Sequence, residues 1–173
     1  MVTNRFPNAP TLTTERLVLR AQHFSDFEHW AKYFSSDRSR FEGGPLDRRA
    51  AWRVWASGVA LWSLKGFGPF GVDDRQSGVY RGEVGIYQPE GYPEPELGWF
   101  VVPEVEGKGM AFEAAKAVML WAKSELGFTR LVNYIDPGNE RSIALGLRLG
   151  GRRVDIRGQD PTDVVIEFDL LKI

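Results

Sequence analysis

Cysteine is absent from the 173-residue chain, and histidine occurs only at His23 and His29. The missing thiols exclude disulfides, thiolate metal sites and a cysteine nucleophile, and two histidines are too few for a histidine-rich metal site. Charge of one sign does not dominate either, because the formal net charge is −1 and the basic residues are scattered. This balance argues against a protein that coats nucleic acid or a membrane surface.

Long apolar runs are missing as well. The longest are short, such as residues 99–103, and cannot cross a bilayer. Residues 1–15 hold no signal-like apolar segment and are interrupted by Pro7 and Pro10, so a cytoplasmic location is expected. The length and the hydrophobic fraction of 43% predict one well-filled domain over residues 1–173, with residues 1–10 as a loose N-terminal arm.

Apolar periodicity predicts seven strands and four helices. The strands are expected at residues 16–20, 70–72, 82–88, 96–102, 130–135, 152–156 and 164–170. The helices are expected from Ser25 to Phe34, from an Asp47 cap to Gly66, between Gly109 and Leu126, and from Asn139 to Leu149. Ser25 and Glu28 have the spacing of a capping box. This order of elements favours a mixed sheet with helices packed on it.

A glycine-rich turn is the feature that points to chemistry. A strand beginning at Glu96 runs into a turn with Gly107 and Gly109, and a helix follows at once. Glycine lets the backbone approach a ligand closely, and the free amides of residues 107–111 at a helix N-terminus favour an anion such as a diphosphate. A plain glycine turn is the alternative. The turn lacks the Ser or Thr of a P-loop and the third glycine of a dinucleotide-binding fingerprint.

Several short segments together resemble the GNAT N-acetyltransferases, in particular the branch of the ribosomal-protein acetylases RimJ and RimL. The acetyl-CoA-binding motif is matched by Gly98-Trp99, Pro103-Glu104, Gly107 to Ala111 and Glu113-Ala114. The next motif is matched by Arg130 to Val132, Pro137 to Ser142 and Leu147 to Gly150, and the first strand by Thr14 to Arg20. The resemblance runs from about Thr11 to Leu170 and is most specific between Glu96 and Gly151.

The resemblance implies an α/β (α+β) fold with a mixed, mostly antiparallel twisted sheet of about seven strands and four helices. Splayed central strands would form a cleft for acetyl-CoA as co-substrate, and no metal is implied. The residues expected to contact CoA are Phe100, Val101, Val102, Gly107, Lys108, Gly109, Met110, Ala111, Asn139 and Ser142. For Asn139 a helix N-cap is an alternative or additional role.

The chain departs from the family pattern at four positions. Glu104 and Glu106 place carboxylates near the expected diphosphate, which is electrostatically unhelpful. Gly146 stands where many relatives have a tyrosine that protonates the leaving thiolate, and Gly151 stands where a phenylalanine usually follows the helix.

The chemistry requires a primary amine to lose a proton before it attacks the thioester directly, in a ternary complex. Glu96 is the predicted general base and Glu83 the reserve; a solvated or salt-bridged carboxylate is the alternative. Ser142 is the predicted proton donor to sulfur, unless its hydroxyl bonds the backbone at the helix start. Tyr134 is a further candidate donor, with aromatic packing as its alternative.

The acceptor side is predicted less sharply. Arg38, Arg40 and Glu42 are expected to border the acceptor site, which would take a peptide N-terminus or a small-molecule amine; a solvated loop is the alternative. Two other functions stay open: a catalytically silent acyl-CoA sensor or scaffold, and transfer from a donor such as succinyl-CoA. No nucleic acid or membrane partner is expected, and the sequence leaves monomer and homodimer both open.

Overall fold

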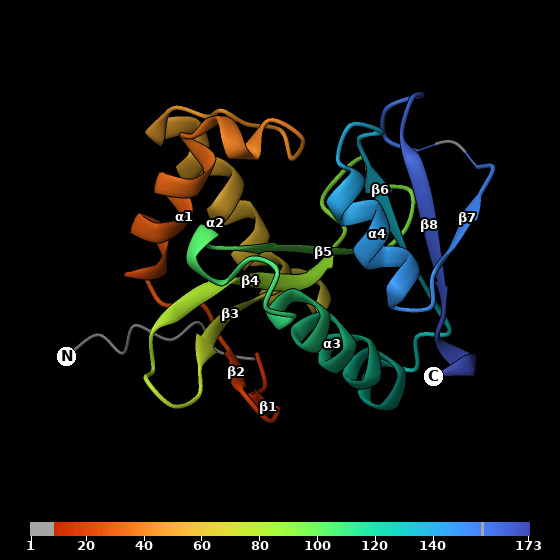
Figure 1. Cartoon of the computed structure of the whole chain (residues 1–173), viewed down its shortest axis with the longest axis horizontal. Helices are drawn as coiled ribbons and strands as arrows, with labels where there is room; N and C mark the ends of the chain where they lie inside the picture. The colour runs from red at the N-terminus through yellow and green to blue at the C-terminus, as the bar shows by residue number, and fades with distance from the viewer. Residues whose placement is uncertain (1–8, 157) are drawn as a thin grey trace.

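The computed structural model describes residues 9–156 and 158–173 (Figure 1). The arm predicted at residues 1–10 lies outside this range except for Ala9 and Pro10. The described chain forms one eight-stranded sheet in the order β1-β2-β3-β4-β5-β6-β8-β7. The strands are β1 Leu12–Thr13, β2 Leu17–Arg20, β3 Pro69–Asp74, β4 Tyr80–Tyr87, β5 Glu96–Val101, β6 Arg130–Ile135, β7 Arg152–Val154 and β8 Val164–Asp169. The α-helices are α1 Asp26–Phe34, α2 Arg48–Lys65, α3 Met110–Leu126 and α4 Glu140–Arg148.

The predicted mixed α/β architecture with four α-helices is confirmed within these residues. The eighth strand is the two-residue β1, which pairs antiparallel with β2 and is too short to give an alternating pattern. A splay between two central strands, implied by the resemblance, is present. Strands β4 and β5 share a ladder of six residue pairs, and so do β6 and β8, whereas β5 and β6 meet in parallel at one pair, Glu96 and Val132. Figure 1 shows β5 running across the molecule while β6 and β8 stand upright beside it.

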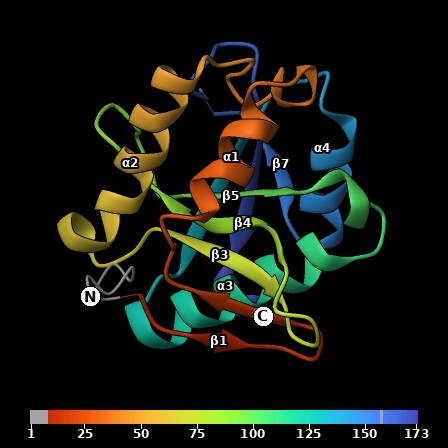
Figure 2. The same ribbon diagram turned by 90° about the vertical axis from the view of Figure 1, so that its left-hand side faces the viewer.

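Helices cover both faces of the sheet, with α3 on one face and α1 with α2 on the other (Figure 2). Side chains alternate between these faces along each strand. Val84 and Leu97 are fully buried in the core cluster that contains the apolar face of α3. Phe100 points to the opposite face and packs in a second cluster with residues of α1 and α2. The face of β4 and β5 that carries Phe100 is therefore the one that α1 and α2 roof over.

Two glycines bring α4 close to β8. A Cβ on Gly146 would lie 3.3 Å from Cγ2 of Ile166, and one on Gly151 would lie 2.4 Å from the same atom. Gly151 is further hemmed in by the Phe168 ring and the Gly146 carbonyl oxygen. These contacts explain why the chain holds glycine where the resemblance leads one to expect Tyr and Phe.

The two predicted helix caps have different outcomes. Asp47 caps α2 as predicted, since its side chain accepts a hydrogen bond of 2.8 Å from the Ala50 amide. The capping box at Ser25 and Glu28 is wrong. Ser25 already has helical backbone angles and makes no side-chain cap, because the turn begins earlier, with the Asp26 amide donating to the His23 carbonyl. Asp26 accepts from the His23 amide, and Glu28 pairs with Arg48 instead.

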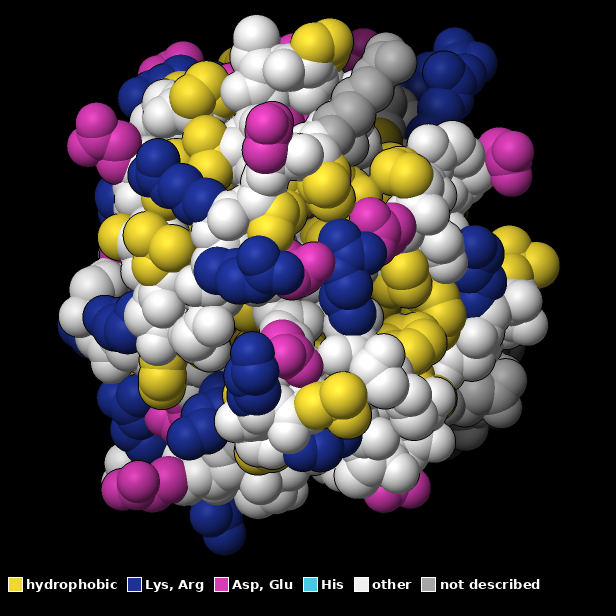
Figure 3. Space-filling model, turned by 90° about the vertical axis from the view of Figure 1, so that its right-hand side faces the viewer, with side chains coloured by type: hydrophobic (Ala, Val, Ile, Leu, Met, Phe, Trp, Pro, Cys, Tyr) yellow, Lys and Arg dark blue, Asp and Glu magenta, His cyan; other side chains and the backbone are white. Residues whose placement is uncertain are grey.

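No described helix is long and apolar enough to cross a membrane. Basic and acidic side chains are interspersed on the face seen in Figure 3, with neither sign gathering over a broad area. Glu167 on β8 pairs with both Arg130 and Arg152. On the outside of the sheet, then, opposite charges neutralise one another locally.

A largely buried ion cluster ties β2, β3 and the start of α1 together. Arg20 donates two hydrogen bonds of 2.7 Å to Asp73 and two of 2.5 and 3.0 Å to Asp26. The Arg20 and Asp26 side chains are only 13% and 3% exposed. Removing the cation would therefore leave a buried carboxylate without its partner.

We expect Arg20→Met to lower the free energy of unfolding by about 3–5 kcal/mol, the usual cost of breaking a buried pair from one side. Urea unfolding followed by circular dichroism measures this loss. Arg48→Met is the matched control, because its pair with Glu28 is exposed and should leave the unfolding midpoint nearly unchanged. Equal effects in the two variants would contradict a structural role for the Arg20 cluster.

Candidate active site

The opening between β5 and β6 exposes backbone groups of β5. The Val102 amide donates to the Arg81 carbonyl at 2.8 Å, whereas the Pro95 carbonyl accepts from Val132 on the opposite side. Since peptide groups alternate in direction along a strand, those of Trp99 and Val101 face the gap. The sheet parts just beyond Glu96, where the Tyr134 amide donates to the Glu96 carboxylate at 3.1 Å rather than to another strand.

A cavity of about 400 Å³ lies in this gap and reaches the glycine turn. Gly107 and Gly109 have left-handed backbone angles, with φ of 72° and 79°, and no atom would contact a Cβ on Gly107 within 4 Å. The predicted CoA residues that line the cavity are Phe100, Val101, Gly107, Gly109, Met110, Ala111, Asn139 and Ser142. Two of the predicted CoA residues do not line this cavity. The Val102 amide bonds toward β4, and Lys108 lines a neighbouring cavity on the other side of the turn.

The N-terminus of α3 faces the same cavity. Its first backbone bond runs from the Glu113 amide to the Gly109 carbonyl at 3.1 Å. The amides of Met110, Ala111 and Phe112 precede that bond and have no acceptor inside the helix. Together with the helix dipole, these amides make the turn suited to an anion.

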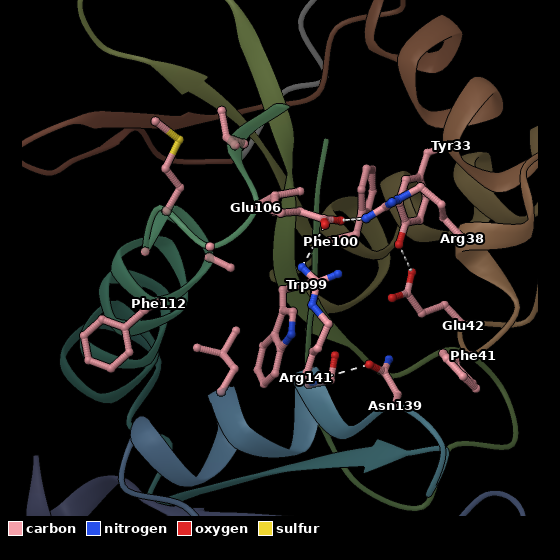
Figure 4. A pocket seen from close by; sticks show the side chains of 18 of the residues that line it. Tyr33, Arg38, Phe41, Glu42, Trp99, Phe100, Glu106, Phe112, Asn139 and Arg141 are labelled. Atoms are coloured by element: carbon pink, nitrogen blue, oxygen red, sulfur yellow. Dashed lines mark hydrogen bonds and ion pairs between the residues drawn. The ribbon is translucent and has the colours of Figure 1, made fainter. Parts of the chain in front are cut away.

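Glu106 joins the two walls of the cavity, as Figure 4 shows. Its carboxylate receives Arg38, from the segment between α1 and α2, and Arg141 from α4, the latter at 2.7 Å. Desolvation alone would raise the pKa of Glu106, but the hydrogen bonds from both arginines hold it below its ordinary value. The acidic residue that looked unfavourable beside a diphosphate is thus neutralised by two cations, a pairing that sequence spacing could not reveal.

Asn139 and Ser142 lie at the start of α4. The Asn139 side chain accepts a hydrogen bond of 3.2 Å from the Ser142 amide, so the N-cap role is present in the structure. A contact between Asn139 and the pantetheine arm stays a prediction. The Ser142 side chain lines the cavity, and its hydroxyl makes no hydrogen bond within the described chain.

A second cavity of about 540 Å³ adjoins the first on the face roofed by α1 and α2. The residues that line both are Arg40, Phe41, Glu42, Trp99, Phe100, Asn139 and Ser142. Arg38, which was also predicted for the acceptor side, lines the first cavity alone. The two spaces therefore meet at the middle of β5 and the start of α4.

Glu96 lines the second cavity at the vertex of the splay. Desolvation raises the pKa of its carboxyl to about 8, aided by nearby Asp163 and opposed by the hydrogen bond from the Tyr134 amide. Its second oxygen accepts from Gln159 at 3.3 Å. A carboxyl that titrates near neutrality beside a cavity has the acidity expected of a general base.

Glu83 and Glu42 also line the second cavity with raised pKa values. Glu83 is 4% exposed and accepts hydrogen bonds from Gln22, Trp30 and Tyr87, yet desolvation raises its pKa to about 7. Glu42 accepts from the Tyr33 hydroxyl at 2.9 Å, and desolvation raises its pKa to about 7.

Sequence reasoning missed several of these groups. Tyr33 lines the first cavity, and Gln159 and Asp163 line the second. They come from segments far apart in the chain, so no local spacing in the sequence indicates them. Tyr134 does line the second cavity as a candidate donor, and its buried hydroxyl has no hydrogen-bond partner within the described chain.

Comparison with known proteins agrees with this geometry. The family model of the acetyltransferase (GNAT) domain matches residues 16–152, so the chain belongs to the GNAT acetyltransferases. It is similar to the acetyltransferase from Agrobacterium tumefaciens str. C58, with 36% identity, a TM-score of 0.90, and coverage of 96% of this chain and 98% of that chain.

Two further likenesses are informative. The uncharacterized N-acetyltransferase YoaA of Bacillus subtilis (strain 168) is 27% identical over 154 residues, which cover 87% of each chain. Mycobacterium smegmatis RimJ, solved in complex with CoA-disulfide, shares the fold with a TM-score of 0.73 and 17% identity, over 95% of this chain and 89% of that chain.

The raised carboxyl pKa values predict how stability depends on pH. A carboxyl with a pKa near 8 when folded and near 4.5 when unfolded binds more protons in the folded state between these values. The free energy of unfolding should therefore fall as pH rises from about 5 to 8. Glu96→Gln should flatten part of this fall, as measured by urea unfolding at pH 5.5, 7 and 8.5. An unchanged pH dependence in the variant would contradict the raised pKa of Glu96.

Proposed function

We propose that this acetyltransferase transfers the acetyl group of acetyl-CoA to a primary amine, in the manner of the RimJ/RimL branch and in the cytoplasm. The observation that carries the proposal is the meeting of two cavities at Trp99, Phe100 and Ser142. One cavity has an anion-binding turn, and the other is lined by carboxylates that attract an amine. Reaction at their junction requires both substrates to be bound together.

The first cavity suits CoA in two respects. The open glycine turn and the free amides of residues 110–112 fit a diphosphate, and the backbone of Trp99 and Val101 can pair with the amides of a pantetheine arm. The solved complex of Mycobacterium smegmatis RimJ with CoA-disulfide is an example of a protein with this fold that binds a CoA derivative. When bound, acetyl-CoA supplies the activated acyl group.

Glu96 is proposed to take the proton from the acceptor ammonium, directly or through water. The freed nitrogen then attacks the thioester carbon, a carbon–nitrogen bond forms, and the carbon–sulfur bond breaks with its electron pair leaving on sulfur. The Ser142 hydroxyl lies at the junction and is proposed to protonate or hydrogen-bond the departing thiolate. An amide donor of β5 can stabilise the developing oxyanion.

The silent CoA-binding module is not favoured. Its support was the two acidic residues at the turn and the missing tyrosine. Glu106 is neutralised by Arg38 and Arg141, and a serine and a tyrosine hydroxyl are present near the junction. Succinyl-CoA also loses support, since Arg38 is engaged by Glu106 and Arg40 by Asp37.

Filling the glycine turn tests the CoA site. Gly109→Trp should weaken acetyl-CoA binding at least tenfold in isothermal titration, because Gly109 lines the cavity and belongs to the turn proposed to hold the diphosphate. Gly127→Trp is the matched control at the other end of α3. It has the same left-handed backbone, and a Cβ there would contact no atom within 4 Å, but it lies away from the cavity. Equal loss of acetyl-CoA affinity in both variants would show that the effect comes from backbone strain and would contradict the proposed site.

Removing the base tests the mechanism. We expect Glu96→Gln to lower kcat by about 10²–10⁴-fold, the usual contribution of a general base. The ionisation near pH 8 should also disappear from the profile of kcat/KM, measured as thiol release from acetyl-CoA. Glu83→Gln, assayed alongside, identifies the base: if it abolishes this ionisation while Glu96→Gln retains it, the role belongs to Glu83.

A further inference from the structure

The acceptor cavity is rich in carboxyl groups and poor in basic side chains. Six carboxylates line it, and Arg40 is the one basic residue among its described lining. Arg40 is already engaged, because its guanidinium pairs with Asp37 at 3.0 Å and lies over the Phe41 ring at 4.4 Å. The six carboxylates are those of Glu42, Glu83, Glu96, Asp136, Asp160 and Asp163.

None of these six carboxylates forms an ion pair within the described chain. They accept hydrogen bonds from neutral groups instead, such as the Tyr33 hydroxyl, the Tyr87 hydroxyl and the Tyr134 amide. Asp136 and Asp160 likewise accept from backbone amides. Nine carboxylates elsewhere in the described chain are, by contrast, each paired with Arg or Lys. The cavity is therefore set apart as a region where carboxyl groups gather without side-chain cations paired to them.

The carboxylates extend from the mouth of the cavity to its floor. Asp136 and Asp160 are exposed, Glu42 and Glu96 are half-buried, and Glu83 is buried. Along the floor, Glu83 lies opposite Phe100 and Glu96 lies beside Tyr87, which separates the two glutamates by four residue pairs. At the usual rise of a strand this separation is about 13 Å. An elongated ligand can thus meet a carboxylate at each end.

The walls between the charges are aromatic and apolar. A further cavity of about 330 Å³ shares side chains with the acceptor cavity, among them Trp30, Glu83 and Tyr87. Its other lining is mostly apolar, such as Trp55 and Leu61, with Arg53 and Ser57 as polar members. Methylene groups gain from burial against such walls, and aromatic faces also attract cations. Glu83 is the one carboxylate in the described lining of this further cavity and is buried, whereas Arg53, the one cation in that lining, is exposed.

The reaction itself limits which acceptor suits this charge. The nitrogen that attacks must be neutral, so a monoamine in its reactive form brings no positive charge to a cavity lined by six carboxyl groups. Building on the proposed function, we propose that the acceptor is a small linear polyamine, with one amine at the reaction centre and a second ammonium held by Glu83 at the floor. The depth of Glu83 favours a slender organic chain over a folded protein's N-terminus.

The titration of the site agrees with this assignment. Desolvation raises the pKa of Glu42 and Glu83 to about 7 and that of Glu96 to about 8, so these groups hold protons near neutral pH when no cation is present. An ammonium beside them lowers their pKa. Binding of a polyamine should therefore release protons, which a monoamine does far less.

Isothermal titration without acetyl donor tests the proposal free of chemistry. The probes are 1,6-diaminohexane, 1-aminohexane, magnesium chloride and a short lysine-rich peptide, each in two buffers of different ionisation enthalpy. We expect the diamine to bind at least tenfold more tightly than the monoamine and to release protons. Equal affinity for both amines, or tighter binding of magnesium or of the peptide, would overturn the proposal.

Charge-neutralising variants locate the second ammonium. Glu83→Gln should reduce the affinity for the diamine about tenfold while leaving that for the monoamine nearly unchanged. Glu125→Gln is the matched control, because it removes one exposed carboxylate of α3 far from the cavity. Should Glu83→Gln unfold the protein, Asp163→Asn tests the same charge excess on the β7–β8 connection. Loss of affinity equal to that of the control would refute the assignment.

Acetyl-CoA then separates this inference from the function on which it rests. Tight diamine binding without thiol release would refute the transferase proposal and leave the polyamine site standing. Thiol release from the monoamine with the same kcat/KM as from the diamine would support the transferase proposal and refute the polyamine site.

Discussion

The molecule depends on one incomplete strand pairing. Strands β5 and β6 are parallel and share one residue pair, Glu96 with Val132, before they diverge. If β5 and β6 stayed paired along their length, hydrogen bonds between them would occupy the backbone groups of β5. No gap would then remain for an extended ligand such as the proposed pantetheine arm. Glu96 stabilises the point of divergence by accepting the Tyr134 amide, which the sheet would otherwise leave unpaired. The residue proposed as the base is therefore also the residue that ends the pairing.

The same opening divides the site electrostatically. On the side of the glycine turn, helix amides and paired arginines offer partial or full positive charge. On the side roofed by α1 and α2, carboxylates stand without cations. This charge distribution attracts a phosphate-bearing substrate to one side of β5 and an ammonium-bearing substrate to the other. The attraction acts before either substrate makes close contacts with side chains.

Much of the fold could be predicted because its signals are local. Apolar alternation marks seven of the strands, and the 3.6-residue stripe with its glycine ends marks α3. The glycine turn before α3 was predictable for the same reason, since Gly107 and Gly109 lie two residues apart. The capping box failed because Ser25 has the right spacing but the wrong backbone, which only the preceding turn decides.

The site was less predictable because its contacts join distant segments. Glu106 reaches Arg38 across 68 residues, and Glu96 reaches Gln159 across 63. No spacing rule links such residues. Burial could not be predicted from the sequence either. Glu83 and Glu28 are the same residue type, yet Glu83 is 4% exposed, whereas Glu28 is open to solvent and pairs with Arg48.

The close packing of α4 on β8 sets the width of the donor cleft. Gly146 in α4 and Gly151 just after it let the end of this helix pack closely on Ile166, and Ser142, one turn before Gly146, lines the gap. A Cβ on Gly151 would overlap Ile166 and force a shift, whereas a Cβ on Gly146 would be a tight contact that requires the Ile166 side chain to give way slightly. The position of α4 beside the cavity thus depends on two glycines that contact β8 and do not line the cavity themselves.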